Sequence, residues 1–171
     1  PHELPTAPEN CQVEGEGLSL CVVKRPATFT VVAHDTSGTR KSSGGDGFFI
    51  AIRGASRVRA RVTDMRNGSY GCEWTPTNSG LYSIAVSLFG VSLPGSPFTV
   101  NVTLPYPYAP NCEARGDALS NVTARTSQSF EVLFRDRLGY VSQAVELDIF
   151  VQPFYEHEGG DDDSIALDLR D

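Results

Sequence analysis

Residues 67–102 constrain the fold of this 171-residue chain most strongly, because apolar and polar side chains alternate there in three short segments. Glycine and proline separate the segments at Asn67-Gly68, Pro76, Gly80, Pro94-Gly95 and Pro97. A period of two between turn residues predicts half-buried antiparallel strands. The residues predicted to face inward are Tyr70, Cys72, Trp74, Tyr82, Ile84, Val86, Leu88, Phe98, Val100 and Val102. The stretch therefore predicts the back half of a β-sandwich.

The opening motif of the chain occurs twice, 101 positions apart. Asn10-Cys11 matches Asn111-Cys112. The same offset relates Gly15 to Gly116, Leu18 to Leu119, Phe29 to Phe130, Val31 to Val132, Asp35 to Asp136 and Gly38 to Gly139. A repeat at a fixed offset indicates tandem modules. The two modules are predicted to begin near residues 10 and 111.

Together these motifs closely resemble a filamin-type immunoglobulin-like repeat. They are C-x-x-x-G-x-x-L at 11–18, NGSY at 67–70, P-x-x-x-G-x-Y at 76–82 and PGSPF at 94–98. The resemblance implies an all-β, immunoglobulin-like antiparallel β-sandwich. Residues 1–9 are then a leader, 10–104 a complete repeat, 105–110 a proline-rich linker and 111–171 a partial second repeat. Such modules bind other proteins and act as spacers, so the resemblance implies no catalysed reaction.

The remaining strands are predicted from the same alternation. In the first repeat, strands are expected over residues 18–24 and 27–35. Phe48, Ile50 and Ile52 are expected to face inward on a third strand, and Val58, Ala60 and Val62 on a fourth. The second repeat is expected to have strands at 129–136 and at 146–152, with Leu147, Ile149 and Val151 inward. EHEGGDDD at 156–163 is interpreted as an acidic insertion before a fourth strand with Ile165, Leu167 and Leu169 inward; the alternative is a disordered acidic tail.

The resemblance places partner binding on the face formed by the third and fourth strands, here residues 47–53 and 57–63, where an extended peptide adds as a further strand. Outward Phe49 and Ala51 would offer apolar contact. The candidate basic stripe consists of Arg53, Arg57, Arg59 and Arg61. We hypothesise that the acidic residues 156–163 lie against this stripe; the alternative is a solvated face that discourages edge pairing. The predicted partner is thus an extended peptide or a neighbouring repeat.

The sequence contains little that points to catalysis. It has no phosphate-binding loop, no nucleophile elbow and no zinc-ligand spacing among its cysteines. His157 lies among carboxylates that suit Ca²⁺, but without the spacing of a calcium loop the cluster reads as a solvated charge run, and His2 and His34 are scattered. The net charge of −7 argues against nucleic-acid binding, and no apolar run is long enough to span a membrane. We therefore predict a non-enzymatic chain with no cofactor or metal.

Cysteines and glycosylation sequons leave the compartment open. Cys21 and Cys72 both belong to the first repeat and form a candidate disulfide, although buried free thiols are an equal alternative. Candidate glycosylation sites are Asn101 and Asn121, with Asn67 discounted as part of the turn motif. One hypothesis is an intracellular cytoskeletal or ciliary scaffold; the alternative is a glycosylated, disulfide-bonded adhesion module on the cell surface, as in some gamete-surface proteins. The sequence does not determine the oligomeric state.

Overall fold

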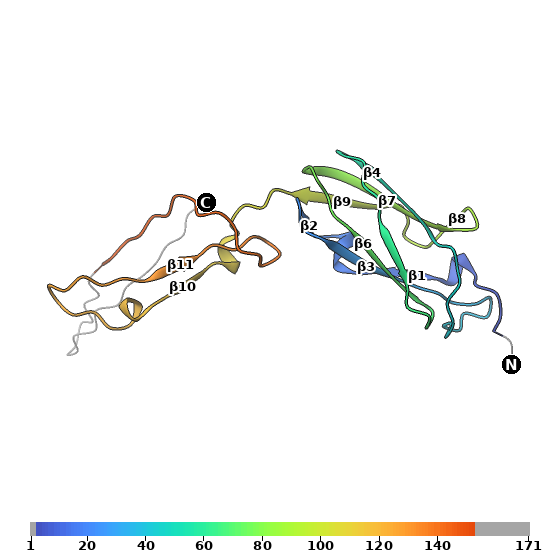
Figure 1. Ribbon diagram of the computed structural model, residues 1–171, viewed down its shortest axis with the longest axis horizontal. Coiled ribbons are helices and arrows are strands. Elements are labelled where there is room, and N and C mark those ends of the chain that lie inside the picture. The colour runs from blue at the N-terminus through green and yellow to red at the C-terminus, as the bar shows by residue number, and fades with distance from the viewer. Residues whose placement is uncertain (1–2, 153–171) are drawn as a thin grey trace. The chain divides into compact units, whose positions relative to one another are not determined.

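The computed structural model describes residues 3–152 of the chain. The chain divides into two compact units, Pro1–Leu104 and Pro105–Asp171. Figure 1 shows them in blue to green and in yellow to red. Each unit is described by itself below.

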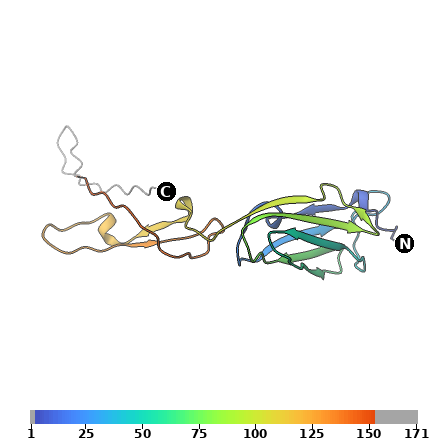
Figure 2. The same ribbon diagram turned by 90° about the horizontal axis from the view of Figure 1, so that it is seen from above.

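The first unit is a sandwich of two β-sheets, seen along different directions in Figures 1 and 2. The four-stranded sheet has the order β1 (Gln12–Glu14), β3 (Ala27–Val32), β6 (Ser69–Trp74) and β5 (Arg61–Asp64). The five-stranded sheet contains β2 (Cys21–Val22), β9 (Phe98–Thr103), β7 (Gly80–Leu88) and β4 (Phe49–Gly54), with β8 (Val91–Ser92) paired to the end of β7. All pairings are antiparallel except that of β2 with β9. The predicted all-β, immunoglobulin-like fold is confirmed.

The core lies between the sheets, where the period-two alternation placed it. The buried residues of the strands from β6 to β9 include Tyr70, Cys72, Trp74, Tyr82, Ile84, Val86, Leu88, Val100 and Val102, each at most 2% exposed. Trp74 and Tyr82 bring the sheets together, with ring centroids 5.4 Å apart. Sequence alternation therefore predicted the inner face of these strands correctly.

Strand boundaries depart from the prediction in the front half of the first unit. Residues 18–24 were expected to be one strand, but β2 covers only Cys21–Val22 because a 3-10 helix, η2 (Glu16–Leu18), precedes it. The fourth strand is also shorter than expected: β5 covers Arg61–Asp64, and upstream Val58 forms an isolated bridge to Ile52. The chain changes sheets here, since Val58 pairs toward β4 whereas β5 pairs with β6.

Residues 3–9, expected to be a leader, are packed onto the first unit. Ala7 is 3% exposed, and its N–H donates to His34 O at 2.9 Å. Pro8 opens the 3-10 helix η1 (Pro8–Asn10). Thr6 donates to Asp46 Oδ1 at 2.8 Å, and the same aspartate accepts from Tyr70 Oη through Oδ2 at 3.1 Å. These hydrogen bonds attach residues 3–9 to the polar loop at residues 36–47. The composition of residues 3–9 did not predict this attachment.

Glu3 makes this attachment sensitive to acid. Its carboxylate accepts hydrogen bonds from the Ser42 hydroxyl at 2.6 Å, from the Ser43 hydroxyl and from the Ser42 N–H at 2.7 Å. These donors, the Ser42 hydroxyl foremost, lower the pKa of Glu3 from 4.5 to about 2. They favour the charged form, so they stabilise the native state only while Glu3 is ionised.

We expect Glu3→Gln to destabilise the first unit in a pH-dependent way. A carboxylate whose pKa is lower in the folded state contributes stability above its unfolded pKa, here 4.5, and loses that contribution as pH falls through its folded pKa of about 2. The difference in melting temperature between native and variant chains should therefore shrink over that interval. Glu14→Gln, at an exposed strand position, controls for the lost charge. A difference that does not change with pH would contradict the assignment.

The second unit repeats the opening local structure of the first. Asn111 Nδ2 donates to Asp136 O at 2.9 Å, as Asn10 Nδ2 donates to Asp35 O at 2.9 Å. Gly15 and Gly116 have φ of 140° and 135°, values that L side chains rarely adopt. Its elements are η3 (Ala109–Asn111), β10 (Glu113–Arg115), η4 (Asp117–Leu119) and β11 (Glu131–Leu133). The matched asparagines and glycines thus also share their hydrogen bond and backbone geometry.

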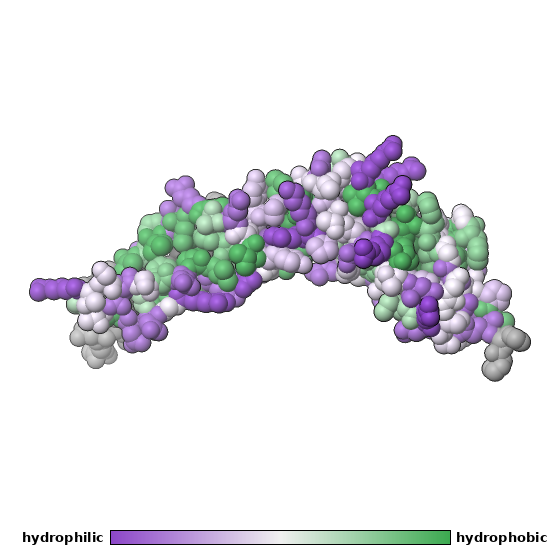
Figure 3. Space-filling model, in the orientation of Figure 1, coloured by the Kyte–Doolittle hydropathy of each residue, from purple (hydrophilic) through white to green (hydrophobic). Residues whose placement is uncertain are grey.

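The third strand predicted for the second unit is absent: residues 143–152 form no strand. Ile149 and Val151, predicted to face inward, are 46% and 69% exposed, so within residues 3–152 no core covers them. In the first unit the equivalent strand β4 is hydrogen-bonded to β7. Within the described part of the second unit, the only sheet is the β10–β11 pair, so this segment has no ladder to join. Hydrophobic residues consequently gather on the face of the second unit seen in Figure 3.

Several predictions fall on residues outside the described range. They are the acidic insertion at 156–163, the fourth strand with Ile165, Leu167 and Leu169, and the interpretation of His157 and its carboxylate neighbours as a solvated charge run; His2 also lies outside the range. The hypothesis that the acidic stretch lies against the arginines stays a prediction.

Candidate protein-binding groove

A groove runs along the edge of the first unit where β4 ends one sheet and β5 ends the other. β4 pairs with β7 along one side only, from Phe49 opposite Ser87 to Gly54 opposite Tyr82. On its other side, the pairing within residues 3–152 is the single bridge between Ile52 and Val58. The backbone of Phe49–Ala51 is therefore unpaired on the groove side. We call this space the β4–β5 groove.

The β4–β5 groove has a volume of about 1100 Å³. Its lining includes all of β4, the residues 57–60 and Val62. Ile50, Val58 and Ala60 are half-buried and pack against the core, and Val62 is 39% exposed. Phe49 is 67% exposed, as its predicted outward position requires, and Ala51 shares that face. The groove thus has an aliphatic interior and a large aromatic ring at its rim.

Three of the four predicted arginines line the groove. Arg53 comes from β4, and Arg57 and Arg59 come from the segment that leads to β5. All three are exposed. Figure 3 shows hydrophilic side chains projecting beside hydrophobic atoms over the part of the first unit where Figure 1 places β4. These arginines give the groove a positive rim.

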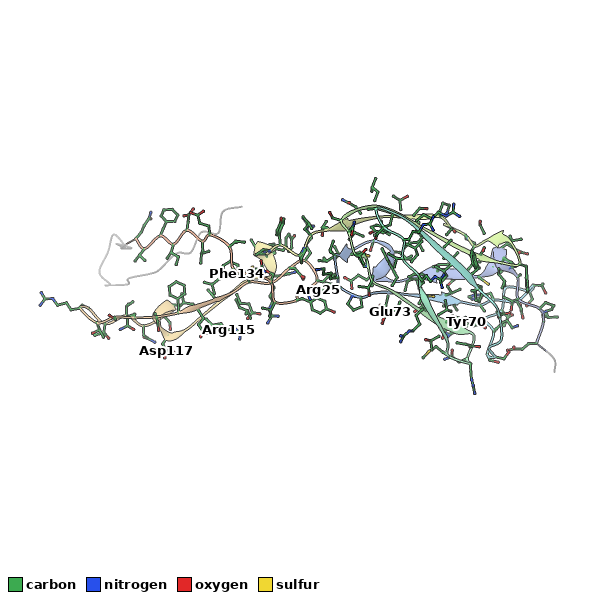
Figure 4. All side chains as sticks on the ribbon, turned by 45° about the horizontal axis from the view of Figure 1, so that its top comes forward. Arg25, Tyr70, Glu73, Arg115, Asp117 and Phe134 are labelled. Carbon is green, nitrogen blue, oxygen red and sulfur yellow. The ribbon has the colours of Figure 1, made fainter. Side chains whose placement is uncertain are left out.

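Arg61 differs from the other three arginines. It does not line the groove, because it lies opposite Glu73 in the β5–β6 ladder. Glu73 is labelled in Figure 4, on the same strand as Tyr70. Alternation along residues 57–62 suggested one continuous stripe, but the change of sheet before β5 separates Arg61 from it. The signal that could have shown this is Gly54-Ala55-Ser56, a turn that brings Val58 back to Ile52.

In the described part of the chain, no carboxylate pairs with the arginines of the groove. Neither Asp nor Glu is among its lining residues. Within residues 3–152, no carboxylate forms an ion pair with Arg53, Arg57 or Arg59. Arginine remains protonated at any physiological pH. Among the residues that the structure describes, the groove therefore carries three positive charges with no carboxylate partner.

The disulfide hypothesised between Cys21 and Cys72 is not formed. Both are free, buried thiols on opposite sheets. Cys21 Sγ donates to Gly17 O at 3.4 Å, whereas Cys72 Sγ donates to Tyr70 O at 3.7 Å. Burial raises the pKa of Cys21 to about 11 and that of Cys72 to about 12. Both remain protonated at neutral pH and are poor nucleophiles.

The three sequon asparagines are all exposed. Asn67 accepts from the Ser69 hydroxyl at 2.6 Å and from its N–H at 3.1 Å, so its side chain belongs to the turn before β6. Asn101 lies on the outer face of β9, opposite Leu81, and Asn121 follows η4 in the second unit.

Two further properties concern other kinds of site. In the described residues, no cluster of three or more His, Cys, Asp or Glu is arranged to hold a metal ion. The helices within residues 3–152 all lack the length and apolarity needed to cross a bilayer.

Comparison with known proteins assigns more than half of the chain to a family. The family model described as Filamin/ABP280 repeat matches residues 5–99. The human E3 ubiquitin-protein ligase TRIM45 is 34% identical over 99 residues, which cover 56% of this chain and 17% of that protein. Rat filamin-C is 37% identical over 89 residues, covering 52% of this chain and 3% of that protein. The chain thus spans less than a fifth of the length of these relatives.

A solved structure supports the fold assignment. The crystal structure of the Lin-41 filamin domain matches with a TM-score of 0.50 and 21% identity, covering 57% of this chain and 95% of that domain. The filamin-type repeat is a structural and protein-interaction fold rather than a catalytic one. It occurs in proteins as different as filamin-C and TRIM45, so the fold alone does not specify the partner.

Proposed function

Because this chain belongs to the Filamin/ABP280 repeat family, we propose that it is a non-enzymatic binding and spacer module that takes up an extended partner segment in the β4–β5 groove. The segment adds to β4 as a further antiparallel or parallel strand. The observation that carries this proposal is the unpaired edge of Phe49–Ala51 beside an open groove.

The physical argument rests on unsatisfied backbone groups. A sheet edge presents N–H and C=O groups that water satisfies until another strand replaces it. The bonds supply affinity for any extended chain, whereas the side chains beside them select among sequences. Phe49, which is 67% exposed, supplies apolar area next to the open edge.

We expect Phe49→Ser to weaken strand binding about tenfold, because a buried aromatic ring contributes roughly 1.5–3 kcal/mol and the ring is only partly covered by one strand. Phe89→Ser is the matched control: Phe89 is 78% exposed but lies outside the groove, in the β7–β8 turn. The probe is a neutral peptide of about eight residues that alternates valine and threonine. Affinity is measured by isothermal titration calorimetry. An equal loss in both variants would contradict groove binding.

Hydrogen exchange identifies the edge that the peptide uses. Binding should protect amides of Phe49–Ala51, because addition of a strand buries them. Protection confined to β1 or β2, the outer strands at the other sides of the two sheets, would place the site elsewhere.

The second unit is proposed to be a partial repeat of the same type, with residues 105–110 as the linker. The hydrogen bond from Asn111 to Asp136 and the matching glycine conformations support this. A cytoskeletal or ciliary scaffold is the proposed setting. The alternative, an adhesion module on the cell surface, draws support from exposed Asn101 and Asn121, but the free thiols do not support its disulfide.

A further inference from the structure

We propose that the β4–β5 groove selects an extended protein segment in which aliphatic residues alternate with acidic ones. This inference rests on the proposed function and adds the chemistry of the partner. The groove has two faces with different side chains. An added strand would turn one of its sides toward each face.

The first face is charged. Arg53, Arg57 and Arg59 line the groove, are exposed, and have no carboxylate partner within residues 3–152. Arg61, by contrast, already lies opposite Glu73. An incoming carboxylate would supply a counter-charge that residues 3–152 do not provide to the three groove arginines. Guanidinium groups bind carboxylates with charge-assisted, bidentate geometry, whereas an incoming lysine would meet only repulsion.

The second face is apolar. Ile50, Val58 and Ala60 are half-buried in the groove, and Val62 remains 39% exposed. Successive side chains of a strand point to opposite sides, so a segment added to β4 turns every second residue toward these aliphatic groups. The residues between them turn outward, to the side on which Arg53 lies. Alternation in the partner is therefore required by the geometry of the edge.

The position of the open edge limits the register. The Ile52–Val58 bridge closes the groove at one end. The new strand must therefore lie mainly against Phe49–Ala51, with Arg53, Arg57 and Arg59 around the closed end. This arrangement places the strongest preference for a carboxylate at the end of the segment nearest the bridge.

The test compares three peptides of about eight residues that alternate valine with glutamate, glutamine or lysine. They are titrated by calorimetry into the full 171-residue chain. Each exposed ion pair contributes a factor of about 1.5 to 5, so three arginines predict roughly tenfold tighter binding of the glutamate peptide than of its glutamine twin at about 50 mM salt. The preference should largely disappear at about 500 mM salt, where screening is strong.

Two variants separate local from general electrostatics. Arg57→Gln combined with Arg59→Gln should remove most of the preference. Arg40→Gln combined with Arg66→Gln makes the same change in net charge at exposed positions outside the groove and should retain it. Circular dichroism confirms that both variants remain folded.

The outcomes are distinguishable. Equal affinity for the glutamate and glutamine peptides, with protection of Phe49–Ala51, overturns the acidic preference and leaves strand addition intact. Tighter binding of the lysine peptide also overturns it. If no peptide protects the β4 edge, strand addition itself fails.

Discussion

Replacing Trp74 by alanine is expected to lower the free energy of unfolding of the first unit by about 3–5 kcal/mol. Trp74 is 1% exposed and packs on Tyr82, with ring centroids 5.4 Å apart and planes at 55°. Its indole Nε1 donates to Gly17 O at 3.2 Å. The substitution removes a large buried ring from between the two sheets and leaves Gly17 O with only the weak thiol donor of Cys21, at 3.4 Å.

Urea denaturation followed by circular dichroism measures this effect, since Trp74 is the only tryptophan and fluorescence would lose its probe. Trp74→Phe separates the two contributions. It keeps most of the packing but removes the indole hydrogen bond to Gly17 O, which keeps only the weak Cys21 thiol donor, so about 0.5–1.5 kcal/mol of the loss should remain. Phe49→Ala, at an exposed position, should stay within about 0.5 kcal/mol of the native chain. If Trp74→Ala also lowered the free energy of unfolding by less than about 0.5 kcal/mol, the ring would not hold the two sheets together.

Gly68→Ala is expected to cost about 2–5 kcal/mol, because a strained backbone and a steric clash act together. Gly68 has φ of 84°, in the left-handed region. A Cβ at this position would lie 1.9 Å from Lys41 O, which is backbone and cannot rotate away. The carbonyl of Gly68 also accepts from Ala33 N–H at 2.8 Å. The substitution should therefore disrupt the junction between the turn before β6 and the loop at 36–47.

Gly71 provides the matched control on β6 itself. A Cβ there would meet no atom within 4 Å. Because glycine weakens a strand interior, Gly71→Ala should be neutral or stabilise the unit by up to about 1 kcal/mol. Thermal unfolding of both variants makes the comparison. Similar destabilisation at the two positions would show that the close approach of Gly68 to Lys41 has no special role.

The buried residues in the back half of the first unit could be predicted one by one from the sequence. There, every second residue of a strand is apolar, and the same residues face the core. Tyr70, Trp74 and Ile84 were placed inward by a period of two, and each is at most 1% exposed. Both sides of β6 and β7 are paired, so neither strand can shift without exposing its apolar face. The outward position of Phe49 and the inward position of Ile52 follow from the same rule.

Prediction was less successful where a segment lacks a regular partner. Arg57, Arg59 and Arg61 look equivalent in sequence, yet only the first two line the groove. The residues 146–152 alternate well but form no strand. Alternation describes which face a strand would bury; it carries no information on whether a neighbouring ladder is present.

The amino-acid sequence by itself determined the fold class, the inward face of the strands from β6 to β9 and the two equivalent chain segments that begin at Asn10 and Asn111. These features depend on local chemistry: the spacing of apolar residues, and glycines at turns. The tertiary structure decided that residues 3–9 belong to the sandwich, that Cys21 and Cys72 remain thiols, and that the Ile52–Val58 bridge closes one end of the groove. These three features depend on contacts between groups that are far apart in the sequence. Alternation of apolar and polar residues along the chain does not predict such contacts.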